Sequence, residues 1–383
     1  MRLVSKFVTA GSLSAVTIAS LLIFSLHAAD HSGKLNPLPG MPPVMDTANL
    51  YAADAPGMLS PTVKNYPSRI YVPNSKSDTV DVIDPATYKI IGHFSLPKHS
   101  RGSLEPQHVV PSWDLKKLWV AQDLGNQLTM IDPATGKQGE TIPVDDPYNM
   151  YYTPDGKYAL VMAERMERID FRDAQTMQVV NKVPVHCEGV NHADFSPDGR
   201  YMLATCEFSS EMIKVDIPAQ KVLGRLKLMP KGMPQDCRIA PDGKVFYVAN
   251  MEANGLHVID GDSFKQVGFI PTGKGAHGLY FSRDSKYLYV SNRGEGSISV
   301  VDTGTRKVIA KWKIPGGGSP DMGGVSSDGK TLWLSGRYNR EIYAFDTSNG
   351  SLRARIKVGE GPHGLCVYPQ PGRYSLGHTG NMR

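Results

Sequence analysis

The chain alternates short apolar runs with turn residues, and it has no long helical period. Residues 276–314 show the pattern most clearly, because four runs rich in Val, Ile, Tyr and Trp are separated by Gly, Asp, Asn and Ser. The runs are Gly278–Ser282, Tyr287–Ser291, Ser297–Val301 and Lys307–Trp312. Runs of this length and composition between turn residues predict β-strands. The segment therefore predicts one four-stranded up-and-down unit.

This unit repeats along most of the chain. Two apolar residues followed by Asp, with some degenerate copies, end at Asp84, Asp132, Asp170, Asp216, Asp260, Asp302 and Asp346. The spacings are 48, 38, 46, 44, 42 and 44 residues. A second marker, a Pro-Asp-Gly turn or a variant of it, falls at Asp155, Asp198, Asp242, Asp284 and Asp328. A period in the low forties with several short strands per unit is typical of propeller blades. Seven markers predict seven blades.

The ends of the repeat region predict how the ring closes. The first unit starts at Arg69–Val72 without an inner strand before it, and Gly364–Tyr368 matches the missing strand. Closure by this segment removes an exposed sheet edge. The fold class is therefore all-β, a seven-bladed propeller over residues 67–383, closed by a C-terminal inner strand in blade 1. Residues 372–383 resemble a further strand, and the pattern leaves their placement open.

Two strands carry a family resemblance. Tyr287–Asn292 (YLYVSN) and Phe246–Asn250 (FYVAN) resemble the YVTN repeat of bacterial and archaeal surface and periplasmic propellers, and the likeness covers roughly residues 69–369. The resemblance implies seven blades and a location outside the cytoplasm. It leaves the chemistry open, because similar propellers include amine-dehydrogenase heavy subunits, haem d1 domains, lactonases and binding modules.

The N-terminus predicts export. Arg2 and Lys6 precede an apolar stretch, Phe7–Leu26, which is followed by small residues at Ala28 and Ala29. This order is typical of a secretory signal peptide, here residues 1–29, although the stretch is also close to the length of a membrane anchor. We expect a periplasmic or extracellular protein that meets the membrane only through this segment if it is uncleaved. Residues 30–66, rich in Pro, Gly, Met and Ala, are predicted to be a linker or wrapping arm.

Charge limits the classes of binding partner, and the cysteines suggest one disulfide. Charged residues make up 21% of the chain, the formal net charge is +5, and no dense Lys/Arg cluster is interleaved with aromatic residues. We therefore expect no nucleic-acid partner. Cys187 and Cys206 flank one repeat unit and are a candidate disulfide in an oxidising compartment. Cys237 and Cys366 lie in apolar runs and are predicted to be buried.

The candidate site follows from blade geometry. The loop before each inner strand and the loop joining the second and third strands open on one face of a propeller, while the Pro-Asp-Gly turns open on the other. Residues before or at the start of the inner strands include His108, His192, Asp236, His277, Asp321 and His363. The joining loops add Glu164, Glu207, Arg293 and Arg337. We predict that these ten residues form a ligand-binding site at the channel mouth.

Four of the ten residues are candidate metal ligands. Histidine and carboxylate side chains suit Zn, Cu or Fe when two or three come within about 2.0–2.2 Å of one ion. The histidines are His108, His192, His277 and His363, and a divalent or transition metal is a candidate cofactor. A water-filled or small-anion pocket and a structural histidine ring are the alternatives. For catalysis, the candidate base-and-carboxylate pairs are His277 with Asp321 and His192 with Asp236.

Three functions remain open on the sequence. The first is an exported binding protein that holds a small molecule, a metal or a protein partner at this site. The second is an enzyme, either a metal-dependent lactone hydrolase or a redox subunit resembling the amine-dehydrogenase heavy chain. The third is a structural surface protein. GxSxG, HExxH and CxxCH motifs are absent from the sequence, so the common motifs of serine hydrolases, zinc proteases and c-type haem proteins are missing.

Overall fold

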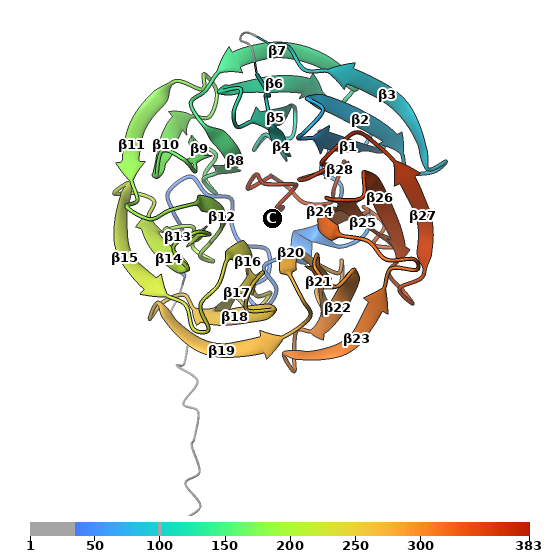
Figure 1. Ribbon diagram of the computed structural model, residues 1–383. Helices are drawn as coiled ribbons and strands as arrows, with labels where there is room; N and C mark the ends of the chain where they lie inside the picture. The colour runs from blue at the N-terminus through green and yellow to red at the C-terminus, as the bar shows by residue number, and fades with distance from the viewer. Residues whose placement is uncertain (1–34, 99–101) are drawn as a thin grey trace, which may run out of the picture. The chain divides into compact units, whose positions relative to one another are not determined.

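The computed structural model describes residues 35–98 and 102–383, and in this part of the chain seven four-stranded antiparallel sheets surround one axis (Figure 1). The predicted signal peptide lies outside the described residues. The expected fold class is confirmed. One 3₁₀ turn, η1 (Ala52–Asp54), accompanies the strands in the described residues.

Each blade runs from an inner strand at the axis to an outer strand at the rim. Blade 1 contains β28 (Cys366–Tyr368), β1 (Arg69–Asn74), β2 (Thr79–Asp84) and β3 (Lys89–Ser95), and blade 2 contains β4 (Pro106–Pro111), β5 (Leu118–Gln122), β6 (Gln127–Asp132) and β7 (Lys137–Pro143). Blade 3 contains β8 (Pro147–Tyr152), β9 (Tyr158–Ala163), β10 (Arg168–Asp173) and β11 (Val179–Pro184), and blade 4 contains β12 (Val190–Phe195), β13 (Tyr201–Cys206), β14 (Glu211–Asp216) and β15 (Lys221–Lys227). Blades 5 to 7 contain β16 (Pro234–Ile239), β17 (Val245–Asn250), β18 (Gly255–Asp260), β19 (Lys265–Pro271); β20 (Ala276–Phe281), β21 (Tyr287–Asn292), β22 (Ser297–Asp302), β23 (Lys307–Lys313); and β24 (Pro320–Val325), β25 (Thr331–Gly336), β26 (Glu341–Asp346), β27 (Leu352–Lys357).

Blade 1 closes the ring as predicted. Strand β28 pairs antiparallel with β1, with Ile70 opposite Val367 and Tyr71 opposite Cys366. Trp333 of blade 7 is buried in the same apolar cluster as Ile70 and Val367, so packing joins the last blade to the first. The C-terminal strand therefore gives the first sheet its inner edge and seals the seam between blades 7 and 1.

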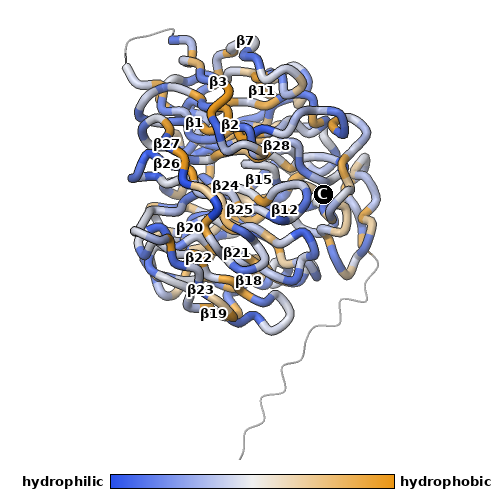
Figure 2. The backbone as a smooth tube through the Cα atoms, turned by 90° about the vertical axis from the view of Figure 1, so that its right-hand side faces the viewer, coloured by the Kyte–Doolittle hydropathy of each residue, from blue (hydrophilic) through white to orange (hydrophobic). Residues whose placement is uncertain are grey.

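Six of the seven repeated aspartates, and the repeated glycines, act locally at turns. The seventh aspartate, Asp170, instead lies within β10 and pairs with Arg168 at 2.7 Å, and Asp173 takes its place at the turn. The Asp84 carboxylate accepts hydrogen bonds from the Ala86 amide at 2.9 Å and the Thr87 hydroxyl at 2.8 Å, and Asp132 makes the same pair of contacts one blade later. In the turns between the first and second strands, glycines adopt a φ of 70–77° that other residues rarely adopt; they are Gly156, Gly199, Gly243 and Gly329. Figure 2 shows the chain from the side, with hydrophobic segments within the blades and hydrophilic segments at many turns.

The predicted arm packs on the face that carries the Pro-Asp-Gly turns. The Leu38 amide donates to the Asp198 carbonyl at 2.7 Å, and the Leu50 amide donates to the Pro241 carbonyl at 2.8 Å. The Tyr51 hydroxyl donates to the Ile239 carbonyl, also at 2.8 Å. Residues 36–66 thus bind the turns of successive blades on the face opposite the candidate site.

The C-terminal tail does not form a regular strand but enters the channel. Figure 1 places the C-terminus close to the axis. The Tyr152 amide donates to the Leu376 carbonyl at 2.9 Å, and the His378 amide donates to the Met150 carbonyl at 2.7 Å, so the tail lies along the inner strand of blade 3. Arg383 Nη2 then donates to Asp194 Oδ1 of blade 4 at 2.8 Å. The strand-like pattern of residues 372–383 therefore reflects a short hairpin in the channel, in which Ser375 pairs with Met382.

The cysteines divide into one disulfide and two buried thiols. Cys187 and Cys206 are disulfide-bonded across 19 residues, which ties the loop before β12 to the end of β13. Cys237 and Cys366 are free and buried, as predicted.

We expect the double substitution Cys187→Ser and Cys206→Ser to destabilise the fold. A cross-link that closes a loop of this length is worth about 3 kcal/mol because it restricts the unfolded chain. Thermal unfolding of the oxidised protein should show a midpoint several degrees higher than that of the double variant, and the variant's midpoint should not respond to reductant. Equal midpoints for the two oxidised proteins would contradict this expectation.

Candidate functional site

Irregular register at the start of the inner strands aims polar side chains at the axis. In β12, β16, β20 and β24 the pairing with the second strand skips two residues, for example between Ala276 and Leu279. Strands β4 and β8 carry a one-residue shift at the same place. Such bulges re-aim side chains and are common beside functional sites. The skipped or adjacent residues include His108, Asn149, His192, Asp236, His277 and Asp321.

These side chains lie deeper than a channel mouth. His108, His192, Asp236 and Asp321 are fully buried, whereas His277 and His363 reach a cavity of about 180 Å³ above them. That cavity is also lined by Tyr148, Glu164, Glu207, Arg293 and Arg337, together with Gln107, Phe208 and Gln235. The predicted residues are thus divided between a buried polar layer and the pocket above it.

His378 joins the buried layer from the tail. Its ring centroid lies 5.3 Å from that of His108 and 5.0 Å from that of His192, and the last two are 5.5 Å apart. One nitrogen of each ring comes within 4.8 Å of the others. Within residues 35–98 and 102–383, the Nε2 atoms of all three rings are buried and have no hydrogen-bond partner. These three imidazoles are therefore a candidate metal-binding group.

The other ring nitrogens of this group contact polar groups of blade 3. His108 Nδ1 lies 2.9 Å from the Tyr148 carbonyl, which can only accept, so Nδ1 carries the proton and Nε2 has a free lone pair. The side-chain amide of Asn149 lies between His378 Nδ1 at 2.9 Å and His192 Nδ1 at 3.2 Å. One amide therefore orients two rings.

A second group, His277, Asp321 and His363, also has metal-ligating atoms within 4.8 Å of one another. His277 Nδ1 lies 3.1 Å from Asp321 Oδ1, and His363 Nε2 lies 3.6 Å from Asp321 Oδ2. Arg293 Nε donates to Asp321 Oδ1 at 2.9 Å, and its Nη2 contacts His277 Nε2. The Arg293 guanidinium therefore places a positive charge beside this group. It also occupies His277 Nε2, the nitrogen through which His277 could act as a base.

The two candidate catalytic pairs have different outcomes in the structure. His277 and Asp321 are in contact, as given above. Asp236 instead accepts hydrogen bonds from the Cys237 and Leu279 amides, both at 2.9 Å, and its Oδ1 lies 3.7 Å from His378 Nε2. The imidazole that faces Asp236 is therefore that of the tail, and the expected pairing of Asp236 with His192 is replaced.

Burial sets the charge state of the layer. Removal from water lowers the pKa of His108 to about 3, and burial and neighbouring cationic groups hold the pKa of the other four histidines well below 6.5. Burial also raises the pKa of Asp236 to about 6. At neutral pH the five imidazoles are uncharged and the Asp236 carboxylate is ionised.

The pocket above is polarised across the axis. The first residue after the second strand is acidic in blades 3 and 4, Glu164 and Glu207, and basic in blades 6 and 7, Arg293 and Arg337. Figure 1 shows blades 3 and 4 on the other side of the axis from blades 6 and 7. Asn191 Nδ2 donates to both carboxylates, at 3.4 Å to Glu164 and 2.7 Å to Glu207. Burial, and the nearby Glu207 charge, raise the pKa of Glu164 well above its ordinary value, so this end of the pocket favours a cation or a proton.

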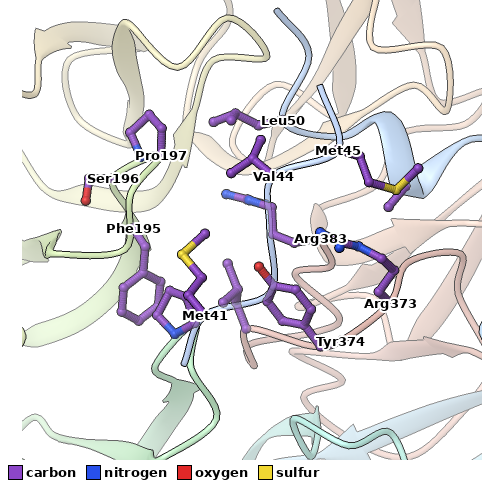
Figure 3. Close-up of a pocket in the computed structure, with 13 residues that line it drawn as sticks. Met41, Val44, Met45, Leu50, Phe195, Ser196, Pro197, Arg373, Tyr374 and Arg383 are labelled. Atoms are coloured by element: carbon purple, nitrogen blue, oxygen red, sulfur yellow. The ribbon is translucent and has the colours of Figure 1, made fainter. Parts of the chain in front are cut away.

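The opposite end of the channel is closed by the arm and the tail. Figure 3 shows Met41, Val44 and Leu50 of the arm beside Phe195–Pro197 of blade 4 and Tyr374 of the tail. The cavity that they line is about 20 Å³, far smaller than the pocket on the other face. Access to the histidine layer is therefore from the face that carries the charged loop residues.

Sequence reasoning missed His378 because the tail has no counterpart in the repeat. The segment Gly377-His378-Thr379-Gly380 does carry a signal, since two glycines with φ of 94° and 109° frame one histidine in a tight turn. It also missed Phe208, which lines the pocket and is largely exposed at its rim. No helix in residues 35–98 and 102–383 is long and apolar enough to span a membrane.

Comparisons with known families support the architecture. The family described as YNCE-like beta-propeller matches residues 42–372. An uncharacterized YncE protein of Salmonella typhimurium is 22% identical over 292 residues, which cover 68% of this chain and 75% of that protein. An uncharacterized protein of Lactococcus lactis is 25% identical over 203 residues, 47% of this chain and 58% of that protein. Antigen Lp49 of Leptospira interrogans is 28% identical over 160 residues, 36% of this chain and 34% of that protein. The chain thus spans little more than half the length of some relatives.

Solved structures share the fold. Hydrazine synthase of Kuenenia stuttgartiensis superposes with a TM-score of 0.62 at 19% identity, covering 76% of this chain and 97% of that one. The dihydro-haem d1 dehydrogenase NirN superposes with a TM-score of 0.59 at 17% identity, covering 81% of this chain and 76% of that one. A functionally unknown protein of Desulfotomaculum acetoxidans reaches 0.63 at 16% identity, covering 78% and 98%. At these identities the likeness shows the architecture alone.

The buried histidines predict loss of stability in acid. Their pKa values are lower in the folded than in the unfolded chain, so below about pH 6.5 the unfolded state binds more protons and stability falls as the pH falls. Each imidazole contributes up to about 1.4 kcal/mol per pH unit in this range. Burial also raises the pKa of five carboxylates, which act in the opposite sense; they are Asp54, Asp123, Glu164, Glu207 and Asp236. The imidazole contribution is therefore measured as a difference between the wild type and a histidine variant.

Thermal unfolding in the presence of chelator should therefore show a change in midpoint, on lowering the pH from 6.5 to 5, that is more negative in the wild type than in His192→Asn, because one of the proton-binding groups is gone from the variant. Equal changes in the two proteins would contradict the assignment of His192 as a neutral, buried imidazole.

Proposed function

Since this chain belongs to the YNCE-like β-propeller family, we propose that it is an exported binding protein whose pocket holds a small dipolar molecule, one with a cationic and an anionic group. The observation that carries the proposal is the charge pattern at one loop position. Glu164 and Glu207 occupy that position in blades 3 and 4, and Arg293 and Arg337 occupy it in blades 6 and 7. A molecule that spans the pocket meets opposite charges at its two ends.

Among the described residues, the basic end has one guanidinium, that of Arg337, without an acidic partner. Arg293 is paired with Asp321, at 2.9 Å from Nε to Oδ1. Arg337 Nη1 instead donates to two uncharged oxygens, Ser75 Oγ at 3.1 Å and the Gly361 carbonyl at 3.3 Å. A carboxylate or similar group suits the remaining donors of Arg337, because a guanidinium binds such groups with two parallel hydrogen bonds.

The acidic end favours a cation. Both carboxylates accept a hydrogen bond from the side-chain amide of Asn191, and both have a raised pKa because they are buried. An ammonium group between them would supply a positive charge and favour the ionised form of both carboxylates. The Tyr148 ring and Phe208 supply apolar walls, as is usual in small-molecule sites.

Export is supported by two features of different kinds. The first 29 residues have the order of charges, apolar residues and small residues typical of a secretory signal peptide. The Cys187–Cys206 disulfide fits an oxidising compartment. A fusion of residues 1–29 to a reporter enzyme that is active only outside the cytoplasm should be active, and an inactive fusion would count against export.

The ligand proposal is tested with ω-amino acids. Glycine, β-alanine and γ-aminobutyrate carry both charges at increasing separation, whereas acetate and ethylammonium carry one charge each. We expect at least one of the three amino acids to bind in calorimetric titrations, and more tightly than either single-charge compound. Charged hydrogen bonds worth about 1.5–3 kcal/mol predict a loss of roughly 10- to 100-fold in affinity for Arg337→Gln and for Glu207→Gln.

Arg340→Gln is the matched control. Arg340 lies in the same loop as Arg337, but it is exposed and pairs with Glu360 at 2.9 Å, outside the pocket lining. Its substitution should leave binding unchanged. Binding that prefers acetate or ethylammonium, or that survives both pocket substitutions, would refute the dipolar assignment.

A further inference from the structure

The deepest part of the channel holds three histidines, His108, His192 and His378, and one nitrogen of each ring lies within 4.8 Å of the other two. The Nε2 atoms of His108, His192 and His378 are buried and, within residues 35–98 and 102–383, without a hydrogen-bond partner. The rings come from blade 2, blade 4 and the C-terminal tail, and buried polar atoms in folded proteins are almost always satisfied. We propose that His108, His192 and His378 together bind one divalent transition-metal ion through their imidazole nitrogens.

The geometry is close to that of a three-histidine centre. One nitrogen of each ring lies within 4.8 Å of the other two. Bonds from zinc to imidazole nitrogen are about 2.0–2.1 Å, so small side-chain shifts bring all three nitrogens to one ion. Three histidine ligands leave a fourth position for water or another ligand.

The surroundings suit a cation held by nitrogen. Asp236 Oδ1 lies 3.7 Å from His378 Nε2 and supplies negative charge beside the ion. His108 is already held with its Nε2 lone pair free, because its Nδ1 donates to the Tyr148 carbonyl. A half-turn of the Asn149 amide would set its oxygen against Nδ1 of both His192 and His378, which frees their Nε2 atoms as well, at the cost of the hydrogen bond that Asn149 Oδ1 accepts from the Met150 amide at 2.8 Å. Such hydrogen bonds to the outer nitrogen are usual for metal-bound histidines.

The neighbouring group is a poorer candidate for the ion. His277 and Asp321 already contact the Arg293 guanidinium, whose charge would repel a metal ion. Imidazole nitrogen selects zinc, copper, nickel, cobalt or iron, whereas calcium and magnesium require oxygen ligands. The proposed site is therefore a transition-metal site beneath the small-molecule pocket, and it does not depend on what that pocket binds.

The test is metal binding to the purified chain after removal of metal with a chelator. We expect one Zn²⁺ or one Cu²⁺ per chain by elemental analysis after dialysis. Affinity should drop by more than about tenfold in His108→Ala and in His378→Ala. Bound Co²⁺ should give visible absorption bands whose position and intensity change in the same variants, which reports on the ligands directly.

His257→Ala is the matched control. His257 is also a fully buried histidine, but it lies in β18 and contacts Asn250 within blade 5, at 3.0 Å from Nε2 to Nδ2. The His257→Ala variant should bind the metal with the same affinity as the wild type. Circular dichroism of each variant checks that the fold is kept, and His378→Gln serves in place of His378→Ala if the alanine variant unfolds.

Three results would overturn the assignment. The first is a chelator-treated chain that takes up no zinc, copper or cobalt, which would mean that a water molecule satisfies the three nitrogens. The second is an affinity that is equal in the wild type, His108→Ala and His378→Ala. The third is loss of the ion in Asp321→Asn with retention in His378→Ala, which would move the ion to the neighbouring group.

Discussion

The pairing of β28 with β1 is the contact on which the site depends. It joins Ile70 to Val367 across nearly the whole sequence and gives blade 1 its inner strand. Only when the ring is closed do seven inner strands point their first residues at one axis. The same segment continues into the tail, so closure and delivery of His378 to the channel follow from one stretch of chain. The fold and the polar layer are therefore coupled.

Much of the fold could be predicted because the same local turn interactions recur in every blade of the repeat. The aspartate after each third strand bonds the next turn, and glycines occupy turns of positive φ, as seen at Asp84 and Gly156. The inner-strand histidines could also be located, because equivalent positions in a repeat point the same way. His363, for example, precedes its inner-strand segment just as His277 does in blade 6.

The rest could not be predicted, because it depends on contacts that have no repeat. His378 lies in a segment used once, and its position is set by backbone bonds to Met150 and Tyr152 that no sequence pattern shows. Likewise, the pairing of Asp236 with His378 rather than His192 depends on where the tail runs. The burial of the inner-strand residues also depends on the arm and the tail, which close one end of the channel.

The loop position occupied by Glu164, Glu207, Arg293 and Arg337 has a consequence for how such a protein can change. Each blade presents that residue from the same backbone geometry, immediately after its second strand. A single codon change there alters what the pocket recognises, while the hydrogen-bond ladder and the apolar packing between blades stay intact. Ligand specificity in this architecture can therefore change during evolution one blade at a time, and each intermediate protein in the series still folds.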